Sequence, residues 1–215
     1  WYEAHLQSGE GLNVMGGLFI GAPTLGVGFN EHHGWGATVN QPDLVDVFVL
    51  DIDPDDENRY RLDGEWRELE AFEIRIKVKL WGWLPWTVKE TAYRSVHGPV
   101  MKTDHGTYAI RDAGMGEIRQ VEQWLAMSAA RSFEEWRDAM RLHRFASFNF
   151  VAADSGGNIM FVHNSMTPNR VSGFDWSEYL PGDRKELIWN SYLPFDALPQ
   201  LFNPQAGYVH SANQT

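Results

Sequence analysis

The clearest pattern in the chain is an alternation of apolar and charged positions over residues 72–80. Phe72, Ile74, Ile76, Val78 and Leu80 alternate with Glu73, Arg75, Lys77 and Lys79. A period of two places the two kinds of side chain on opposite faces of a strand. The sequence therefore predicts a half-buried antiparallel strand, turned by residues 81–85 and followed by a return strand over 87–93.

Shorter apolar runs, separated by turn residues, predict further strands. The run 47–52 is apolar and β-branched, and it ends at the turn residues 53–56. Asp63-Gly64 predicts a hairpin turn between residues 60–62 and 66–69. Residues 148–153 and 158–163 flank the turn segment 154–157 and indicate another hairpin. The stretch 168–204 is rich in Pro, Gly, Asp and aromatic residues, which is typical of a long irregular segment on a surface.

Two segments have helical character. Ser132 and Glu135 form a capping-box pattern at the start of an apolar series with helical spacing. The segment 117–130 is also predicted to be helical, with Val121, Leu125 and Ala129 on its apolar face. Strands followed by helices, without alternation of single strands and helices, predict an α+β fold with an antiparallel sheet.

Composition narrows the class of protein. The 215 residues are 43% hydrophobic and 22% charged, as in a folded globular domain, and aromatic residues reach 13%. The net charge of −11 argues against nucleic acid and against an anionic membrane surface as partners. The absence of cysteine excludes disulfides, thiolate catalysis and cysteine zinc sites. No segment has the length of a membrane-spanning helix or the pattern of a signal peptide, and both ends read as cuts through a longer polypeptide.

Two short motifs have a possible chemical role. Asp43-Leu44-Val45-Asp46 places two carboxylates around a carbonyl, a donor set that suits calcium, although the local pattern alone favours a turn before the next strand. Asn213 carries an amide that can donate to an oxyanion, and a solvated asparagine is the simpler reading. The histidines lack the H-E-x-x-H spacing of zinc hydrolases and are better explained by surface or packing positions. No serine lies in a G-x-S-x-G pattern.

A series of short motifs in fixed order carries a family resemblance. They are Trp1-Tyr2-Glu3-x-His5-Leu6, Asn13-Val14-Met15-Gly16, Gly28-Phe29-Asn30, Gly34-Trp35-Gly36-Ala37-Thr38, Asp43-x-Val45-Asp46, His97-Gly98-Pro99-Val100, Ala153-Asp154-x-x-Gly157-Asn158 and Asn203-Pro204-x-x-Gly207-Tyr208. Together they span nearly the whole chain and resemble the large subunit of the penicillin acylase and acyl-homoserine-lactone acylase family. The resemblance implies an N-terminal nucleophile hydrolase, whose αββα sandwich has two stacked antiparallel sheets between helical layers.

The resemblance also implies an activity. These enzymes cleave a linear amide, releasing an acyl or arylacetyl group from an amine such as a β-lactam nucleus or homoserine lactone. The nucleophile is a serine exposed by self-cleavage of a precursor, and its α-amino group acts as the base. Residues 1–215 match only part of the large subunit. We therefore expect the nucleophile segment and the C-terminal remainder to lie outside this chain, and the isolated fragment to be inactive.

Matching positions identify the site residues that the resemblance implies. The backbone N–H of Val39 and the side-chain amide of Asn213 correspond to the two oxyanion donors. Val27 and Phe148 correspond to positions that line the acyl pocket. Asp43, the carbonyl of Val45, and Asp46 correspond to a calcium site, so the resemblance reverses the preference for a simple turn.

Further expectations concern partners and location. The resemblance implies a small (alpha) subunit and the rest of the same precursor as partners, with further calcium ligands contributed from both, and export to the periplasm or beyond. It implies neither nucleic acid binding nor membrane insertion. The alternative is a non-catalytic or degenerate member of the family that serves as a binding or structural domain.

Overall fold

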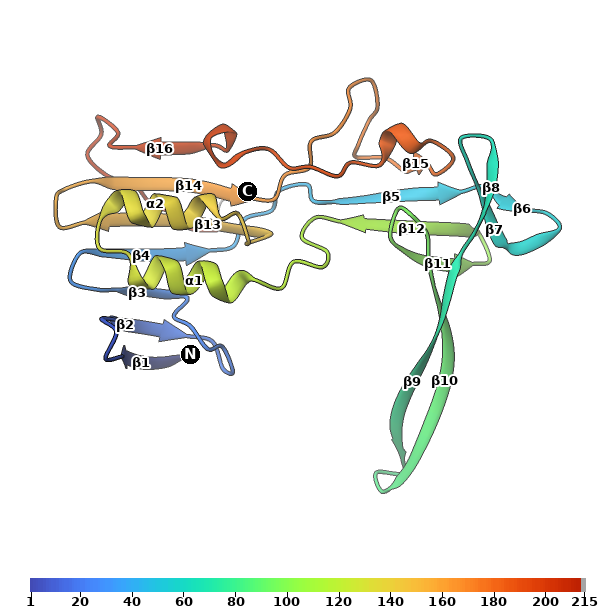
Figure 1. Ribbon diagram of the computed structural model, residues 1–215, viewed down its shortest axis with the longest axis horizontal. Coiled ribbons are helices and arrows are strands. Elements are labelled where there is room, and N and C mark those ends of the chain that lie inside the picture. The colour runs from blue at the N-terminus through green and yellow to red at the C-terminus, as the bar shows by residue number, and fades with distance from the viewer. Residues whose placement is uncertain (214–215) are drawn as a thin grey trace. The chain divides into compact units, whose positions relative to one another are not determined.

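The structure is a computed structural model that describes residues 1–213 and forms two compact units (Figure 1). Unit 1 comprises Trp1–Leu44, Ala113–Pro168 and Ser191–Thr215. Unit 2 comprises Val45–Asp112 and Asn169–Asn190. Each unit is built from segments that are distant in sequence, so the chain enters and leaves both units more than once.

Unit 1 contains a seven-stranded antiparallel sheet with the strand order β1-β2-β3-β4-β13-β14-β16. Its strands are β1 (Tyr2–Gln7), β2 (Asn13–Leu18), β3 (Val27–Phe29), β4 (His33–Thr38), β13 (Ser147–Asp154), β14 (Ile159–Ser165) and β16 (Gln200–Phe202). The hairpin predicted over 148–163 is confirmed as β13 and β14. Its first strand pairs with β4, which brings segments about a hundred residues apart in sequence side by side.

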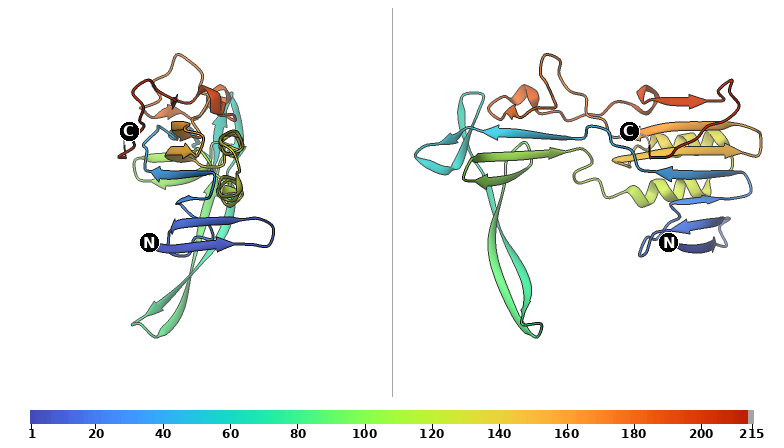
Figure 2. Two further views of the ribbon diagram at one scale, coloured as in Figure 1. Left: turned by 90° about the vertical axis from the view of Figure 1, so that its left-hand side faces the viewer. Right: turned by 180° about the vertical axis from the view of Figure 1, so that it is seen from behind.

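Helices α1 (Gln120–Ala129) and α2 (Phe133–Arg141) cover one face of this sheet (Figures 1 and 2). The buried core between them and the sheet includes Trp35, Met127, Trp136 and Phe150. A short 3-10 helix, η2 (Phe195–Ala197), adds Phe195 to the same core. The helices and the sheet each bury one apolar face. Strands β4 and β13 contribute Trp35 and Phe150 to this shared core.

The helix predictions are confirmed in position and corrected in detail. Ser132 caps α2, accepting a hydrogen bond from the backbone N–H of Glu135 at 3.2 Å, while the Glu135 carboxylate accepts from the backbone N–H of Arg131 instead of that of Ser132. In α1 the predicted apolar face was wrong. Val121 and Leu125 are exposed, whereas Gln123 is buried.

The burial of Gln123 has a direct cause. Its side-chain oxygen accepts from the backbone N–H of Arg144 at 2.6 Å, and its nitrogen donates to the carbonyl of Met140 at 3.4 Å. A buried amide with partners at both ends is well tolerated, so the helix turns this face inward.

The regular elements of unit 2 are strands, apart from one short 3-10 helix. One sheet has the order β15-β5-β12-β11-β10-β9 and a smaller one has the order β6-β7-β8. The elements are β5 (Val45–Leu50), β6 (Ile52–Asp53), β7 (Asp56–Leu62), β8 (Glu65–Glu68), β9 (Glu70–Leu80), β10 (Leu84–Arg94), β11 (Pro99–Thr103), β12 (Gly106–Asp112), β15 (Leu180–Pro181) and η1 (Lys185–Leu187). The predicted Asp63-Gly64 turn is confirmed, with both residues at positive φ.

The alternating segment forms strand β9, as predicted, and the following strand β10 returns along it for eleven paired positions. Its predicted half-burial was wrong. Phe72, Ile74, Ile76 and Leu80 are all exposed. Their exposure shows that no layer of described residues covers most of the apolar face. Only Tyr93 and Arg94, at the base of β10, pair with a further strand.

The predicted α+β class with mainly antiparallel sheets is confirmed. The long irregular segment predicted over 168–204 contains only the short elements β15, η1, η2 and β16. Within residues 1–213, no helix combines the length and the apolar character needed to cross a membrane.

Candidate active site

A pocket of about 230 Å³ in unit 1 brings together three of the predicted site residues, Val39, Phe148 and Asn213. Its other lining residues are Trp1, Phe19, Gly26, Ala37 and Thr38. The pocket lies where β4 ends and β13 begins, two adjacent strands of the central sheet. None of the lining side chains is ionisable, so the pocket wall is apolar except for one hydroxyl, one amide, the indole N–H of Trp1 and the main chain.

The polar corner of the pocket is formed by Val39 and Asn213. The backbone N–H of Val39 donates to Oδ1 of Asn213 at 3.1 Å, across 174 positions of sequence. Asn213 has a φ of 59°, in the left-handed region that asparagine adopts more readily than most residues. The two amide groups that were predicted as oxyanion donors are therefore adjacent.

Buried amides behind the pocket fix the main chain at the Val39 carbonyl and at Asn40. Asn149, which is fully buried, donates from Nδ2 to the carbonyl of Val39 at 3.3 Å. Asn40 donates from Nδ2 to the carbonyl of Asn164 at 2.9 Å and accepts a hydrogen bond from Ser147. These contacts hold the chain that follows the Val39 nitrogen, at the Val39 carbonyl and at Asn40. Sequence reasoning missed these asparagines, because a buried polar residue gives no local signal.

A hydroxyl pair ties the C-terminal segment to the sheet. The side chains of Thr38 and Ser211 are hydrogen-bonded to one another. Ser211 lies two residues before Asn213, so this contact anchors the segment that carries the amide. The geometry of the site thus depends on two segments that are far apart in the sequence, the end of β4 and residues 211–213.

The apolar wall includes aromatic side chains that the sequence analysis did not single out. The rings of Trp1 and Phe19 lie 4.3 Å apart, and both are exposed at the pocket mouth. Val27 does not line the pocket itself. A Cβ built on Gly17 would lie 3.2 Å from the Trp1 ring and 3.4 Å from Val27 Cγ2, so these two side chains meet over Gly17. Phe148 is half-buried and meets Trp124 of α1 edge-on.

The histidines of the chain that are most deeply buried make structural hydrogen bonds. His33 on β4 hydrogen-bonds through Nε2 to the carbonyl of Met127 at 2.9 Å, and His97 does the same to the carbonyl of Gly182 at 2.8 Å. Burial lowers the pKa of both side chains. Their role is packing, as the sequence analysis expected.

The three residues of the predicted calcium site differ in environment. Asp43 is exposed and lies in the loop before β5, and Val45 opens that strand. Asp46 is buried, and its Oδ2 accepts from Trp189 Nε1 at 2.6 Å and from Arg170 Nε at 3.1 Å. Its Oδ1 lies 3.0 Å from Arg170 Nη2 and accepts no hydrogen bond of good geometry among the described residues.

This donor chemistry fits a hard cation in part. A buried carboxylate oxygen with unused lone pairs is a suitable ligand, whereas Arg170 already balances the charge of Asp46. Within residues 1–213, no three acidic or histidine side chains gather as a metal site. A cation here therefore needs Asp43 and ligands from outside the described residues.

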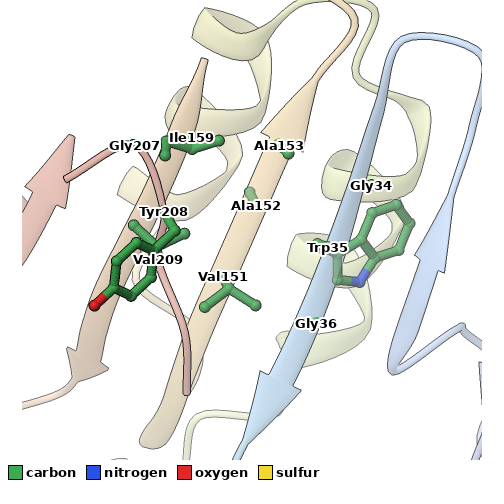
Figure 3. Close-up of a pocket in the computed structure, with 10 residues that line it drawn as sticks. All are labelled: Gly34, Trp35, Gly36, Val151, Ala152, Ala153, Ile159, Gly207, Tyr208 and Val209. Carbon is green, nitrogen blue, oxygen red and sulfur yellow. The ribbon is translucent and has the colours of Figure 1, made fainter. Parts of the chain in front are cut away.

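A larger pocket of about 440 Å³ lies over strands β4, β13 and β14 (Figure 3). Its lining includes Gly34, Val151, Ile159 and Tyr208. Tyr208 is the one ionisable side chain among its lining residues, and the pocket contains none of the predicted site residues. The smaller pocket is therefore the better candidate for an active site.

Comparison with known proteins identifies the family of the chain. The structure is similar to that of a thermostable penicillin G acylase from Alcaligenes faecalis, with a TM-score of 0.88 and 30% identity, covering 100% of this chain and 38% of that one. The fold is thus that of the penicillin acylases. A profile of the penicillin amidase family matches residues 1–215, and the chain belongs to this family.

Two curated relatives have a similar sequence identity to this chain. Penicillin G acylase of Escherichia coli is 32% identical over 211 residues, which covers 96% of this chain and 24% of the relative. The acyl-homoserine lactone acylase PvdQ of Pseudomonas syringae pv. tomato is 30% identical over 177 residues, which covers 79% of this chain and 23% of the relative. The chain spans about a quarter of the length of these curated relatives.

Proposed function

We propose that the polypeptide containing this chain hydrolyses a linear amide, and that Val39 and Asn213 stabilise the negative charge that develops on the substrate's carbonyl oxygen. The observation that carries this proposal is the 3.1 Å contact between the Val39 N–H and the Asn213 amide in the polar corner of an apolar pocket. Membership of the penicillin amidase family supports the reaction class.

The chemistry follows from what the two groups can donate. Attack on an amide carbonyl converts its oxygen into an oxyanion, which preorganised N–H groups stabilise more than they stabilise the starting carbonyl. The Val39 N–H now donates to Asn213 Oδ1, and the substrate oxygen would replace this acceptor. A turn of the Asn213 amide then presents Nδ2 to the same oxygen, so that both groups donate.

The surrounding contacts allow both groups to donate to the substrate oxygen with little change in structure. The Val39 carbonyl accepts from buried Asn149, so the peptide unit that follows the Val39 N–H is held in place when the acceptor changes. Asn213 is exposed, so its amide has room to turn. One hydrogen bond is exchanged for a stronger, charge-assisted one.

The attacking group and base are not among the residues that line this pocket. We infer from the family resemblance that both belong to a serine at the start of the processed large subunit, with its α-amino group accepting the proton. The chain described here would orient the carbonyl and bind the acyl group, and the serine would complete the site.

The acyl group would bind against the apolar wall of the pocket. Phe148, Trp1 and Phe19 offer aromatic surface, and Val27 lies beside Trp1 with an aliphatic side chain. Relatives are named for penicillin G and for acyl-homoserine lactone. We therefore propose phenylacetyl and fatty-acyl amides as the two substrate classes to compare.

The test is an assay of the full processed polypeptide with both classes of amide. Release of free amine from phenylacetyl amides, long-acyl amides or both is the expected result. A folded, self-processed protein that releases amine from neither would overturn the proposal and favour a non-catalytic member of the family.

We also propose that calcium binds at Asp43, the Val45 carbonyl and Asp46, together with ligands from the rest of the precursor and its small subunit. When bound, the ion would supply structural support to the start of β5. The test compares the melting temperature of the full polypeptide in calcium and in a chelator. A higher value in calcium that disappears in Asp43→Asn is expected. Equal melting temperatures in both conditions would contradict the proposal.

A further inference from the structure

The ribbon formed by β9 and β10 is the most exposed apolar element of unit 2. Figures 1 and 2 show its distal part running away from the other strands of that unit. Trp81 and Trp83, in its turn, are 81% and 73% exposed, and Trp86 just beyond it is 56% exposed. Trp81 and Gly82 both have positive φ, so the turn is tight and displays its indole rings outward.

One face of the ribbon is apolar from the turn back to the pair of Val88 and Ile76, beyond which Glu90 lies opposite Ile74. The register places Trp86 opposite Val78, Val88 opposite Ile76 and Leu84 opposite Leu80, so aliphatic and aromatic side chains alternate onto a common face. An isolated two-stranded ribbon is marginally stable in water. Exposed apolar surface of this extent marks a site of interaction.

The other face of the ribbon is basic. Between residues 74 and 89 the charged residues are Arg75, Lys77, Lys79 and Lys89, with no acidic residue. Glu73 lies 2.6 Å from Arg75 and 3.2 Å from Lys89, which leaves Lys77 and Lys79 nearest the tip without an ion pair among the described residues. The free positive charge is therefore concentrated beside the tryptophans.

We propose that the tip of the β9–β10 ribbon binds the headgroup region of an anionic lipid membrane. Tryptophan prefers the boundary between headgroups and acyl chains, and lysines beside it are attracted to anionic lipids. The aliphatic side chains behind the tip suit hydrocarbon, and they have no counterpart in a nucleic acid ligand. The membrane would be bound at its surface and not crossed.

The net charge of −11 does not oppose this contact at the tip. Nine strand residues extend for about 30 Å, which is several times the screening length of about 8 Å at physiological salt. Within the ribbon, the local charge of residues 74–89 therefore governs the attraction. The sequence-based argument against an anionic membrane holds for the average surface and not for this element.

The test uses the full processed polypeptide and sedimentation with vesicles. Vesicles of equal phosphatidylcholine and phosphatidylglycerol are compared with vesicles of phosphatidylcholine alone. We expect binding to the anionic vesicles and at least tenfold weaker binding to the neutral ones. Since each basic residue near the surface contributes about fivefold, Lys77→Gln with Lys79→Gln should weaken binding by about thirtyfold.

Matched variants distinguish the contribution of the tip to membrane binding from that of the rest of the surface. Trp81→Ser with Trp83→Ser should abolish binding, whereas Trp66→Ser, an exposed tryptophan outside the ribbon, should leave it unchanged. Arg67→Gln with Lys185→Gln removes two exposed cations elsewhere in unit 2 and should change binding by less than threefold. Amine release should be unchanged in all four variants, which keeps this test separate from that of the proposed function.

Three results would overturn the proposal. They are no binding to anionic vesicles, binding that the tip variants do not weaken, and self-association of the polypeptide that the Trp81 and Trp83 changes remove. The last would show that a second copy covers the ribbon. Circular dichroism and melting temperature establish that each variant is folded.

Discussion

Asn149 lies behind the candidate site and does not touch the pocket. Its side chain is fully buried and donates to the Val39 carbonyl, which follows the nitrogen that would bind the oxyanion. It acts on the site by holding the peptide unit between Val39 and Asn40, which is next to the one that carries the Val39 N–H. Its effect on activity should therefore accompany an effect on stability.

We predict that Asn149→Ala lowers the free energy of unfolding by about 1–3 kcal/mol, because it removes a buried hydrogen bond and leaves the Val39 carbonyl with one partner fewer. Urea denaturation of the full polypeptide measures this change. Asn169→Ala removes an exposed asparagine and should stay within about 0.5 kcal/mol of the wild type. Equal stability of the two variants would contradict the assigned role of Asn149.

The buried histidines predict a pH dependence of stability. Burial lowers the pKa of His97 below its ordinary value of 6.5, an effect that its hydrogen bond to Gly182 partly offsets and that the nearby Arg111 reinforces. Above pH 6.5 both folded and unfolded chains hold a neutral ring. As the pH falls through that value, the unfolded chain gains a proton that the folded chain does not, so stability is lost.

The free energy of unfolding should therefore fall between pH 7.5 and 5.5, and it should fall less in His97→Gln, whose amide can still donate to Gly182. Glu117 does not contribute in this window, because hydrogen bonds from Arg119 hold its pKa at about 2 and its contribution is lost only under more acidic conditions. If the free energy of unfolding of His97→Gln keeps the full wild-type pH dependence, His97 is not responsible for it.

The grouping of candidate site residues was predictable from the sequence only where a motif order implied it. Val39, Phe148 and Asn213 meet in one pocket, as the family resemblance implied, although their roles there are proposals. Trp1 and Phe19 were missed because an exposed aromatic side chain has no pattern that distinguishes a pocket wall from ordinary surface.

Among the elements, the close contact of β2 and β3 depends on glycine. A Cβ on Gly16 would lie 2.1 Å from the carbonyl oxygen of Val27 and 2.6 Å from Gly28 Cα, both of them backbone atoms that have no freedom to move aside. The strand pair that carries Val27 and ends beside the pocket therefore requires the absence of a side chain at this position.

We predict that Gly16→Ala destabilises the polypeptide by about 3 kcal/mol or more, at the upper end of the range for overpacked sites. Gly9→Ala is the matched control, since a Cβ there meets nothing within 4 Å. Thermal unfolding should separate the two variants clearly. A small shift for Gly16→Ala would mean that β2 and β3 do not approach as closely as described.

The cap of α2 gives a second test at this scale. Ser132→Ala removes the side-chain acceptor for the Glu135 N–H and should cost about 1 kcal/mol. Ser132→Asp retains an acceptor and should recover most of the loss. Failure of the aspartate to do so would indicate that the serine acts through something other than capping.

Element type and element burial were not equally predictable. The period of two over residues 72–80 identified β9, and the capping box identified α2. Periodicity shows which side chains share a face, and it does not show whether another layer covers that face. The apolar face of β9 is exposed because no layer of described residues covers it. Helix α1 buries Gln123 in place of Leu125, because hydrogen bonds to Arg144 and Met140 satisfy the Gln123 amide.

At the scale of the whole molecule, the antiparallel α+β class followed from the order of strands and helices, whereas the division into two units did not. Each unit joins segments far apart in the sequence, and the pairing of β4 with β13 carries no local signal. The order of the family's motifs was the one feature of the sequence that related segments so far apart.

The central claim is that Asn213 donates to the developing oxyanion, and kcat/KM for amide hydrolysis tests it most directly. In the full processed polypeptide, Asn213→Ala should lower kcat/KM by about a hundred- to thousandfold, mainly through kcat, because the interaction strengthens in the transition state. Asn169→Ala should leave kcat/KM unchanged, and both variants should keep the wild-type melting temperature. A loss of less than about threefold in Asn213→Ala would contradict the claim, since removing an oxyanion donor costs far more than that.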